Sequence, residues 1–256
     1  MSIDGDSTGH RSAIERTRSR LGPEPVLVGW TAAVDHGLDV GPGPAAVHVA
    51  GVTPRRARGL VAHRLALDPA DVVAAEGGRR TSDLRTAMDL ARGVGTAELA
   101  IDHRVVLLDA FLHLTRMPAV VARERAMSES GLWGLRDGRR VLALARDGVQ
   151  SPKESELRLL LRHRRWPEPI VQCPVTSPGG MLVAHLDLGW PEFRVGVEYD
   201  GAVHRDRAQH SRDMERHNAI RLAGWLVLQV GTRLLRQPDR LCAELAELVR
   251  LQRRRS

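Results

Sequence analysis

Two acidic residues in the second half of the chain have the types and the spacing of a metal site. Asp187 stands near the end of the segment MLVAHLDL, and Glu198 stands near the end of FRVGVEYD. If both segments are strands, Asp187 lies on the polar face of the first, and Glu198 with Asp200 lies on the polar face of the second. Carboxylates at neighbouring strand ends repel each other unless a cation joins them, and Mg²⁺ binds such oxygens. The pattern therefore predicts a divalent-metal site held by Asp187 and Glu198.

Two groups after Glu198 are suited to handle the proton of an attacking water. His204 can act as a general base, because a neutral imidazole accepts a proton near pH 7. Asp200 is the alternative group for orienting the water. A lysine cannot follow Glu198 in this role, because Lys153 is the only lysine and the other 37 cationic side chains are arginines.

Glu154 has two interpretations. Ser151 and Glu154 match the S-x-x-E capping box at the start of a helix, and Glu154 also stands four residues before Arg158, so its role could be purely local. Glu154 also shares a helix face with Leu157 and Leu161, so the same side chain could point inward to the acidic site. The sequence leaves both interpretations open.

The predicted helix from His204 to Ala223 carries the cations best placed to hold a phosphate backbone. Phosphate contacts position a nucleic acid without reading its sequence. Arg216 has an alternative role, an ion pair with Asp213 three residues earlier. His185 is interpreted as an ordinary strand histidine. The candidate DNA-binding residues are Arg205, Arg207, Arg212 and Arg216.

The elements that must position these residues follow from periodicity. The second half predicts an α/β domain with one mixed sheet over residues 169–231, flanked by helices. The segment WLVLQVG is apolar throughout, which predicts a central strand. The expected elements are a helix from Ser151, strands at PIVQCPVT, MLVAHLDL and FRVGVEYD, a helix from His204 to Ala223, a strand at WLVLQVG, and a helix from about Gln237 to Arg253.

Strand register decides whether the two acids can meet. In the simplest tight hairpin, Leu188 pairs with Phe193 and Asp187 faces Arg194. Glu198 then lies about 13 Å away, at ~3.3 Å per residue. One ion cannot bridge that gap, so the metal site requires splayed strands or another register.

The first half predicts an α-rich α+β region. Residues 1–22 are polar and are expected to be loose apart from a short helical run from Ala13 to Leu21, and residues 23–145 form the region itself, with a strand at AAVHVAG. TSDLRTAMDLARGV predicts a helix capped by Thr81 or Ser82. Further helices are expected at 96–116, 118–128 and 131–145. A linker at 146–150 precedes the domain at 151–256.

Composition bounds the function classes. The 256 residues are 43% hydrophobic without a long uncharged apolar stretch, so no membrane span is expected. The absence of a glycine-rich phosphate loop argues against a nucleotide cofactor. Two cysteines and no secretory signal favour the cytoplasm. Residues 151–256 carry +5 of the net charge of +7. That excess indicates an anionic partner such as DNA, or only GC-rich coding.

The ordered motifs resemble a known family. LDLGWP, VEYDG, His204, Asp213 and Arg216 before GWLVLQV are similar to the domain of unknown function number 559. That family is related to the very-short-patch repair endonucleases of the PD-(D/E)XK superfamily. The resemblance covers roughly residues 151–251. It implies a restriction-endonuclease-like mixed sheet, Mg²⁺ or Mn²⁺, and hydrolysis of DNA phosphodiester bonds.

The resemblance assigns roles and shows one departure. Asp187 corresponds to the motif aspartate, Glu198 to the second acid and Glu154 to the acid of the first helix. The superfamily lysine is replaced by Asp200, and His204 is the natural substitute. The first half more weakly resembles the regulator-like or antitoxin-like region that precedes such domains in actinobacterial proteins, best at TSDLRTAMDLA.

Two rival hypotheses stand beside the nuclease. The missing lysine favours a catalytically inactive nucleic-acid-binding or regulatory protein on the same fold. The third hypothesis is a scaffold whose basic excess reflects codon usage alone.

Overall fold

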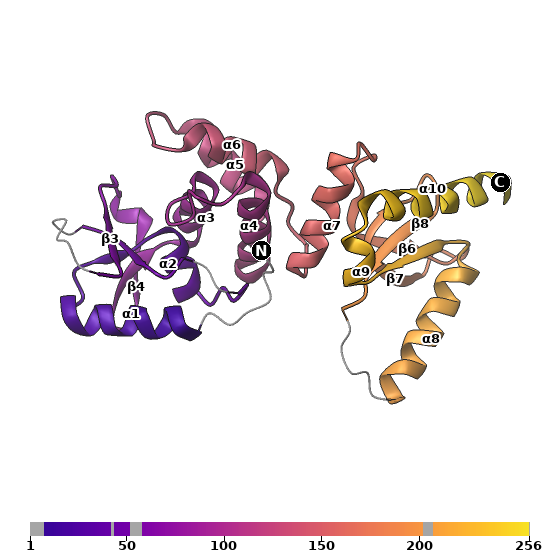
Figure 1. The fold of residues 1–256 in the computed structure, drawn as a ribbon, viewed down its shortest axis with the longest axis horizontal. Coiled ribbons are helices and arrows are strands. Elements are labelled where there is room, and N and C mark those ends of the chain that lie inside the picture. The colour runs from indigo at the N-terminus through magenta and orange to yellow at the C-terminus, as the bar shows by residue number, and fades with distance from the viewer. Residues whose placement is uncertain (1–7, 42–43, 52–57, 202–206, 256) are drawn as a thin grey trace. The chain divides into compact units, whose positions relative to one another are not determined.

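The computed structural model describes residues 8–41, 44–51, 58–201 and 207–255, with only the backbone for residues 207–212. The chain divides into two compact units, residues 1–152 and 153–256 (Figure 1). Each unit contains one mixed sheet with helices beside it. This architecture confirms the predicted mixed α/β class.

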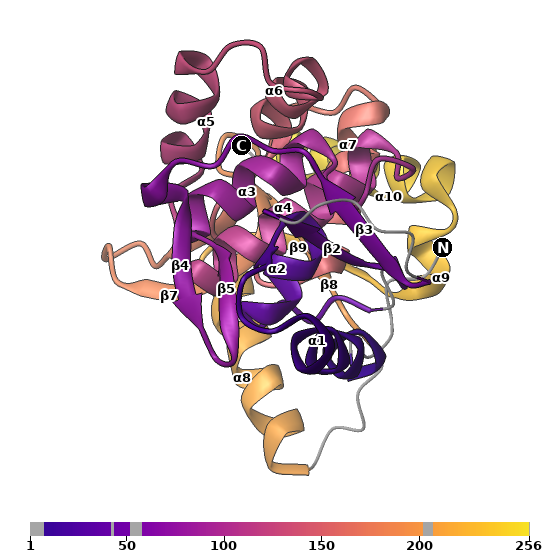
Figure 2. The ribbon, with the colours of Figure 1, turned by 90° about the vertical axis from the view of Figure 1, so that its left-hand side faces the viewer.

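A five-stranded sheet forms the centre of unit 1. Its order is β3-β2-β1-β5-β4, with parallel pairs β1–β5 and β2–β3 and antiparallel pairs β1–β2 and β4–β5. Figure 2 shows β4 and β5 as a hairpin at one side of this sheet. The strands are β1 (Val26–Leu27), β2 (Val47–Ala50), β3 (Leu60–His63), β4 (Val72–Ala75) and β5 (Gly78–Thr81).

The helices of unit 1 agree with the sequence pattern except at the N-terminus. Ser82 caps α3, and its hydroxyl accepts the N–H of Arg85. The expected helical run in the N-terminal segment begins earlier, so the loose segment is wrong for residues 8–12, which belong to α1. His10 and Ile14, one turn apart, are buried as α1 packs against α2 and β2. The helices are α1 (Thr8–Leu21), α2 (Gly29–Asp35), α3 (Asp83–Arg92), α4 (Ile101–Thr115), α5 (Ala119–Ser128) and α6 (Leu135–Leu144).

Within the described residues, no single helix has the length and apolar character to cross a membrane. The pair α4 and α5 satisfies those criteria jointly but bends by 116° at its junction.

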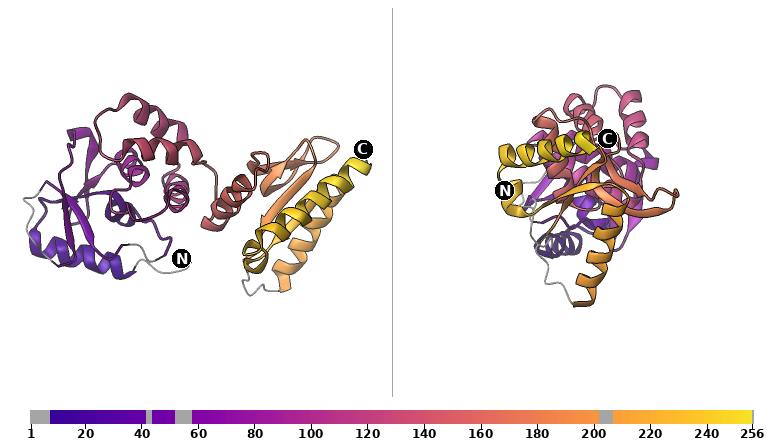
Figure 3. Two further views of the ribbon diagram at one scale, coloured as in Figure 1. Left: turned by 45° about the horizontal axis from the view of Figure 1, so that its top comes forward. Right: turned by 90° about the vertical axis from the view of Figure 1, so that its right-hand side faces the viewer.

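Unit 2 has the predicted order of elements and the predicted mixed sheet. The strand order is β6-β7-β8-β9; β6, β7 and β8 are antiparallel, and β9 returns parallel to β8 after α8. The helices α8 and α10 lie on opposite sides of the sheet (Figures 1 and 3). The elements are α7 (Pro152–His163), β6 (Ile170–Thr176), β7 (Leu182–Trp190), β8 (Val195–Tyr199), α8 (Arg207–Leu222), β9 (Leu226–Val230), α9 (Thr232–Leu235) and α10 (Pro238–Arg255).

The predicted central position of β9 is wrong, because β9 is an edge strand of this sheet. Its apolar sequence has another cause. Leu226 and Leu228 pack on the cluster that includes α10 residues, whereas Val227 packs on the cluster that includes Ile220 of α8. Both faces are therefore covered by helices although one hydrogen-bonding edge is open.

Two glycines face each other where β7 and β8 pair. Gly189 lies opposite Gly196 in the register. A Cβ added to Gly189 would lie 2.6 Å from the Cβ of Cys173, which is fully buried. The sheet can pack this tightly beside Asp187 and Glu198 only because both positions lack a side chain.

We expect Gly189→Ala to lower the free energy of unfolding by about 1–3 kcal/mol, because an added methyl overpacks a filled core. Urea unfolding of the full chain measures the change. Gly179→Ala is the matched control, since its added Cβ meets nothing closer than 3.8 Å. Equal stability of the two variants would contradict the packing argument.

Candidate functional site

The observed register brings the two predicted acids together. Leu188 pairs with Val197, not with Phe193, because Pro191–Arg194 form a longer turn closed by Phe193 N–H to Trp190 O at 3.0 Å. The next position along this register sets Asp187 against Glu198. The N–H of Tyr199 accordingly donates to Asp187 Oδ2 at 2.7 Å. The tight hairpin and its 13 Å separation are therefore wrong.

A line of polar side chains crosses the whole sheet at this level. Gln172 and Asp187 lie between the paired positions of β6 and β7, and Glu198 pairs with Gln229 of β9. We call these four residues the polar row. Glu154 of α7 joins one end of it, where Gln172 Nε2 donates to Glu154 Oε2 at 3.1 Å.

Glu198 is the most fully satisfied acid of the group. Its side chain is 9% exposed; Oε1 accepts from Arg216 Nη2, and Oε2 accepts from Gln229 Nε2 at 2.7 Å. His217 Nε2 lies 3.4 Å from the same Oε2. Burial raises the pKa of Glu198, but the hydrogen bond and charge of Arg216, with the other two donors, outweigh burial and leave the pKa below its ordinary value.

Asp187 has the opposite balance. Burial, followed by the negative charges of Glu154 and Glu198, raises its pKa to about 6. The N–H of Tyr199 and the charge of Arg216 act against this rise but do not cancel it. Asp187 Oδ1 has no hydrogen-bond partner among the described residues. Among the described side chains, the guanidinium of Arg216 is the cation that acts on the half-buried Asp187, and it is shared with Glu198.

The structure describes some of the remaining predicted site residues but not others. Glu154 is buried and contacts Gln172, so it points toward the row as the inward interpretation expects. Asp200 follows β8, is half-buried, and its N–H donates to Val230 O at 3.0 Å. His204 and Arg205 lie outside the described residues, as do the side chains of Arg207 and Arg212.

Arg216 is not a free surface cation in this structure. Its Nη2 bonds both Glu198 and the carbonyl of His185, the latter at 2.8 Å. Its guanidinium is therefore already engaged by the candidate site. His185 itself is exposed on β7, consistent with an ordinary strand histidine.

Three members of the site have no place in the sequence-based prediction. They are Gln172, His217 and Gln229. The signal for two of them is visible, because Gln172 and Gln229 are the polar interruptions of two otherwise apolar strands. His217 gives no such signal within a helix that is polar throughout.

The side chains around Asp187 and Glu198 can be compared with the ligands that Mg²⁺ requires. Among the described residues, no group of three or more His, Cys, Asp or Glu side chains is placed to hold an ion. Mg²⁺ commonly uses only one or two carboxylates and completes its shell with water and substrate oxygens. Asp187, with its unpartnered oxygen and raised pKa, and its neighbour Glu198 fit that smaller requirement.

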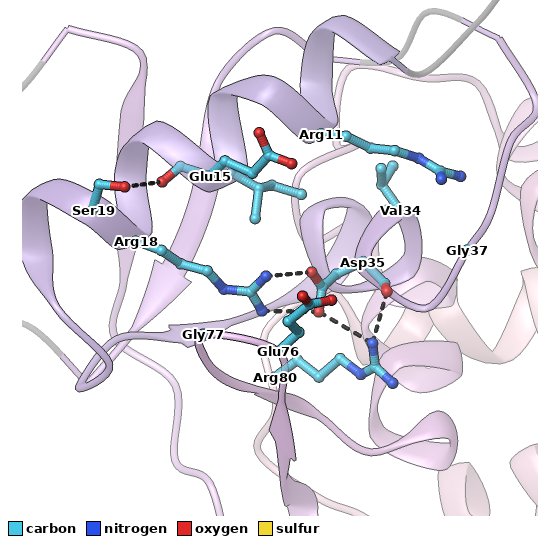
Figure 4. A pocket seen from close by; sticks show the side chains of 11 residues that line it. Arg11, Glu15, Arg18, Ser19, Val34, Asp35, Gly37, Glu76, Gly77 and Arg80 are labelled. Carbon is cyan, nitrogen blue, oxygen red and sulfur yellow. Dashed lines mark hydrogen bonds and ion pairs between the residues drawn. The ribbon is translucent and has the colours of Figure 1, made fainter.

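Unit 1 contains a separate cavity of about 440 Å³ between α1, the end of α2 and the β4–β5 turn (Figure 4). Arg18 donates to both oxygens of Asp35, at 2.8 and 3.0 Å, and Arg80 Nη1 reaches Asp35 Oδ2 at 3.1 Å. Three arginines and three acids line the cavity, so its charges balance. A polyanion gains nothing from such a balanced lining, which leaves the polar row as the candidate site.

Comparison with known proteins gives relatives without an assigned activity. Two uncharacterized proteins from strains of Mycobacterium tuberculosis are 28% identical over 230 residues, which cover 88% of this chain and 82% of each relative. No family model matches the chain. No solved structure gives a significant match.

We expect Asp187→Asn to raise the free energy of unfolding at pH 7 by about 1–2 kcal/mol, because it removes a charge that burial disfavours. Between about pH 4 and pH 6 the unfolded chain has lost this proton while the folded chain still holds it, so wild-type stability falls as pH rises. The variant lacks that contribution. Urea unfolding in EDTA across this range measures both curves; parallel curves would contradict the prediction.

Proposed function

We propose that unit 2 hydrolyses phosphodiester bonds in DNA with a divalent cation, Mg²⁺ or Mn²⁺. The observation that carries the proposal is the position of Asp187 beside Glu198 on adjacent strands, with the pKa of Asp187 raised by burial and by the neighbouring carboxylates. The mixed sheet, the order of elements and the resemblance to nuclease-like domains support it.

In the proposed site, Asp187 and Glu198 hold the cation. A bound cation of this kind supplies an activated water and neutralises charge that develops on the phosphate. Glu154 adds negative charge beside Asp187, and Gln229 fixes Glu198 Oε2. His204 takes the proton of the water or orients it, with Asp200 as the alternative group for orienting the water.

The proposed partner is the DNA backbone. The positive excess of residues 151–256 attracts phosphate without regard to base sequence. Arg205, Arg207 and Arg212 lie at the start of α8 or just before it, on the segment that leads from Glu198 to Arg216. A cytoplasmic location, suggested by the two free cysteines, belongs to this proposal as well.

We expect the wild type to nick or cut DNA with Mg²⁺ or Mn²⁺ and EDTA to stop the reaction. Asp187→Asn should abolish cutting without weakening DNA binding, because it removes only a negative charge. His204→Ala should slow cutting by ~10²–10⁴-fold if the imidazole takes the proton. If Asp200 orients the water instead, Asp200→Asn carries that loss and His204→Ala is nearly silent. Plasmid nicking measures the rates.

Glu247→Gln is the matched control for Asp187→Asn, since Glu247 is an exposed acid of α10 that pairs with Arg250 on the same helix. Its cutting rate should equal that of the wild type. Wild-type protein that binds DNA but cuts no substrate with any divalent metal would remove the enzyme from the proposal.

Arg216 and a metal ion should compete for Glu198, because both need the same carboxylate. We expect Arg216→Met to tighten Mn²⁺ binding about 3–10-fold, the effect of removing one charge interaction of about 1 kcal/mol. Electron paramagnetic resonance of free Mn²⁺ measures the affinity. Arg221→Met, at an exposed position of the same helix, should leave it unchanged. Weaker binding by Arg216→Met would mean that Arg216 holds Glu198 ready for the metal.

The second candidate function is DNA binding or regulation without catalysis. The engagement of Glu198 by Arg216, together with Asp200 at the position of the superfamily lysine, favours it. Under this alternative the protein binds DNA with a steep dependence on salt, as counterions are released, and Asp187→Asn changes no enzymatic rate.

A further inference from the structure

Gln172 adopts a backbone conformation that is unusual inside a strand. It lies in β6 with φ 47°, in the left-handed region that L residues other than glycine and asparagine rarely enter. Such strain persists only where the surrounding structure enforces it, and it is concentrated at functional sites.

The strain coincides with a change of face in both paired strands. Val171 packs on the cluster that includes α7 and α10 residues, whereas Cys173 belongs to the cluster that includes Ile220 of α8. Residues two apart in a regular strand share one face. On β7 their partners Leu188 and Leu186 divide between the same two clusters. Leu186 and Leu188, which regular alternation would place on one face, therefore pack on opposite faces at this level.

We infer that Gln172 is a positioning residue whose strained backbone serves to bring its amide to Glu154, and this inference rests on the proposed function. Glycine would satisfy the backbone at φ 47° more easily but has no amide. Asparagine also tolerates this region, but its side chain is one methylene shorter. Gln172 Nε2 donates to Glu154 Oε2 at 3.1 Å, a contact that the shorter asparagine would have to make from one methylene further back. Gln172 thus supplies one of the contacts that position the carboxylate whose charge acts on Asp187.

The test compares two glycine variants of the full chain. Arg165 has a similar backbone, φ 59°, in the turn after α7 and outside the polar row. Arg165→Gly should raise the melting temperature by about 2–4 °C and leave Mn²⁺ affinity within twofold. Gln172→Gly should not lower the melting temperature, since relief of strain offsets the lost hydrogen bond, yet should weaken Mn²⁺ binding about 5–10-fold.

A double variant separates positioning from any direct effect of Gln172. If Gln172 acts through Glu154, adding Gln172→Gly to Glu154→Gln weakens Mn²⁺ binding no further than Glu154→Gln alone. Additive losses would overturn the inference, as would a lower melting temperature with unchanged Mn²⁺ affinity in Gln172→Gly.

Failure of the proposed function gives a different result. In that case the wild type binds no Mn²⁺, and crystal structures of the wild type and of Gln172→Gly then decide the inference. A displaced Glu154 carboxylate in the variant supports positioning by Gln172, and an unmoved carboxylate overturns it.

Discussion

The site is built around one constraint, the repulsion among the carboxylates of Glu154, Asp187 and Glu198, which lie close together at one level of the unit 2 sheet. Glu154 and Glu198 both raise the pKa of Asp187, on top of the effect of burial. Buried charges are tolerated only when hydrogen bonds or counter-charges compensate them. The surrounding groups do this: Gln172 bonds Glu154, the N–H of Tyr199 bonds Asp187, and Arg216 with Gln229 bonds Glu198. The need to compensate the three carboxylates explains why these polar groups lie inside an otherwise apolar layer.

The crossover from β8 through α8 to β9 is what supplies half of these groups. A parallel strand pair requires such a crossover, and it carries Arg216 and His217 over Glu198 before returning Gln229 to pair beside it. The edge position of β9 is compatible with this task, because helix residues cover both of its faces. The facing glycines Gly189 and Gly196 keep β7 and β8 closely packed next to the acids.

Periodicity and capping predicted the element order of unit 2 and the cap of α3, because long apolar patterns and a Ser at the N-cap are local signals. They failed where the outcome depended on pairing. The turn Pro191–Arg194 shifted the hairpin register, and no local pattern at Leu188 distinguishes Phe193 from Val197 as a partner. The short strands β1 and β5 are held by neighbouring strands, and GRRT has no apolar pattern to mark it. The sequence pattern also gives no sign that Val171 and Cys173 pack on opposite faces of the sheet, since this depends on the backbone angle φ of Gln172.

The two acids of the site differ in how their charge is compensated. The negative charges of Glu154 and Glu198 raise the pKa of Asp187, and the guanidinium of Arg216 acts against them. Arg216 is committed to Glu198, whose pKa it helps to lower, so its charge only partly reaches Asp187. The two acids are thus pushed to opposite sides of their ordinary pKa values, a separation typical of sites in which one group stays ionised and the other awaits a partner. In the proposed site, a divalent cation beside Asp187 would offset the repulsion from the neighbouring carboxylates; without one, the raised pKa lets Asp187 take up a proton instead.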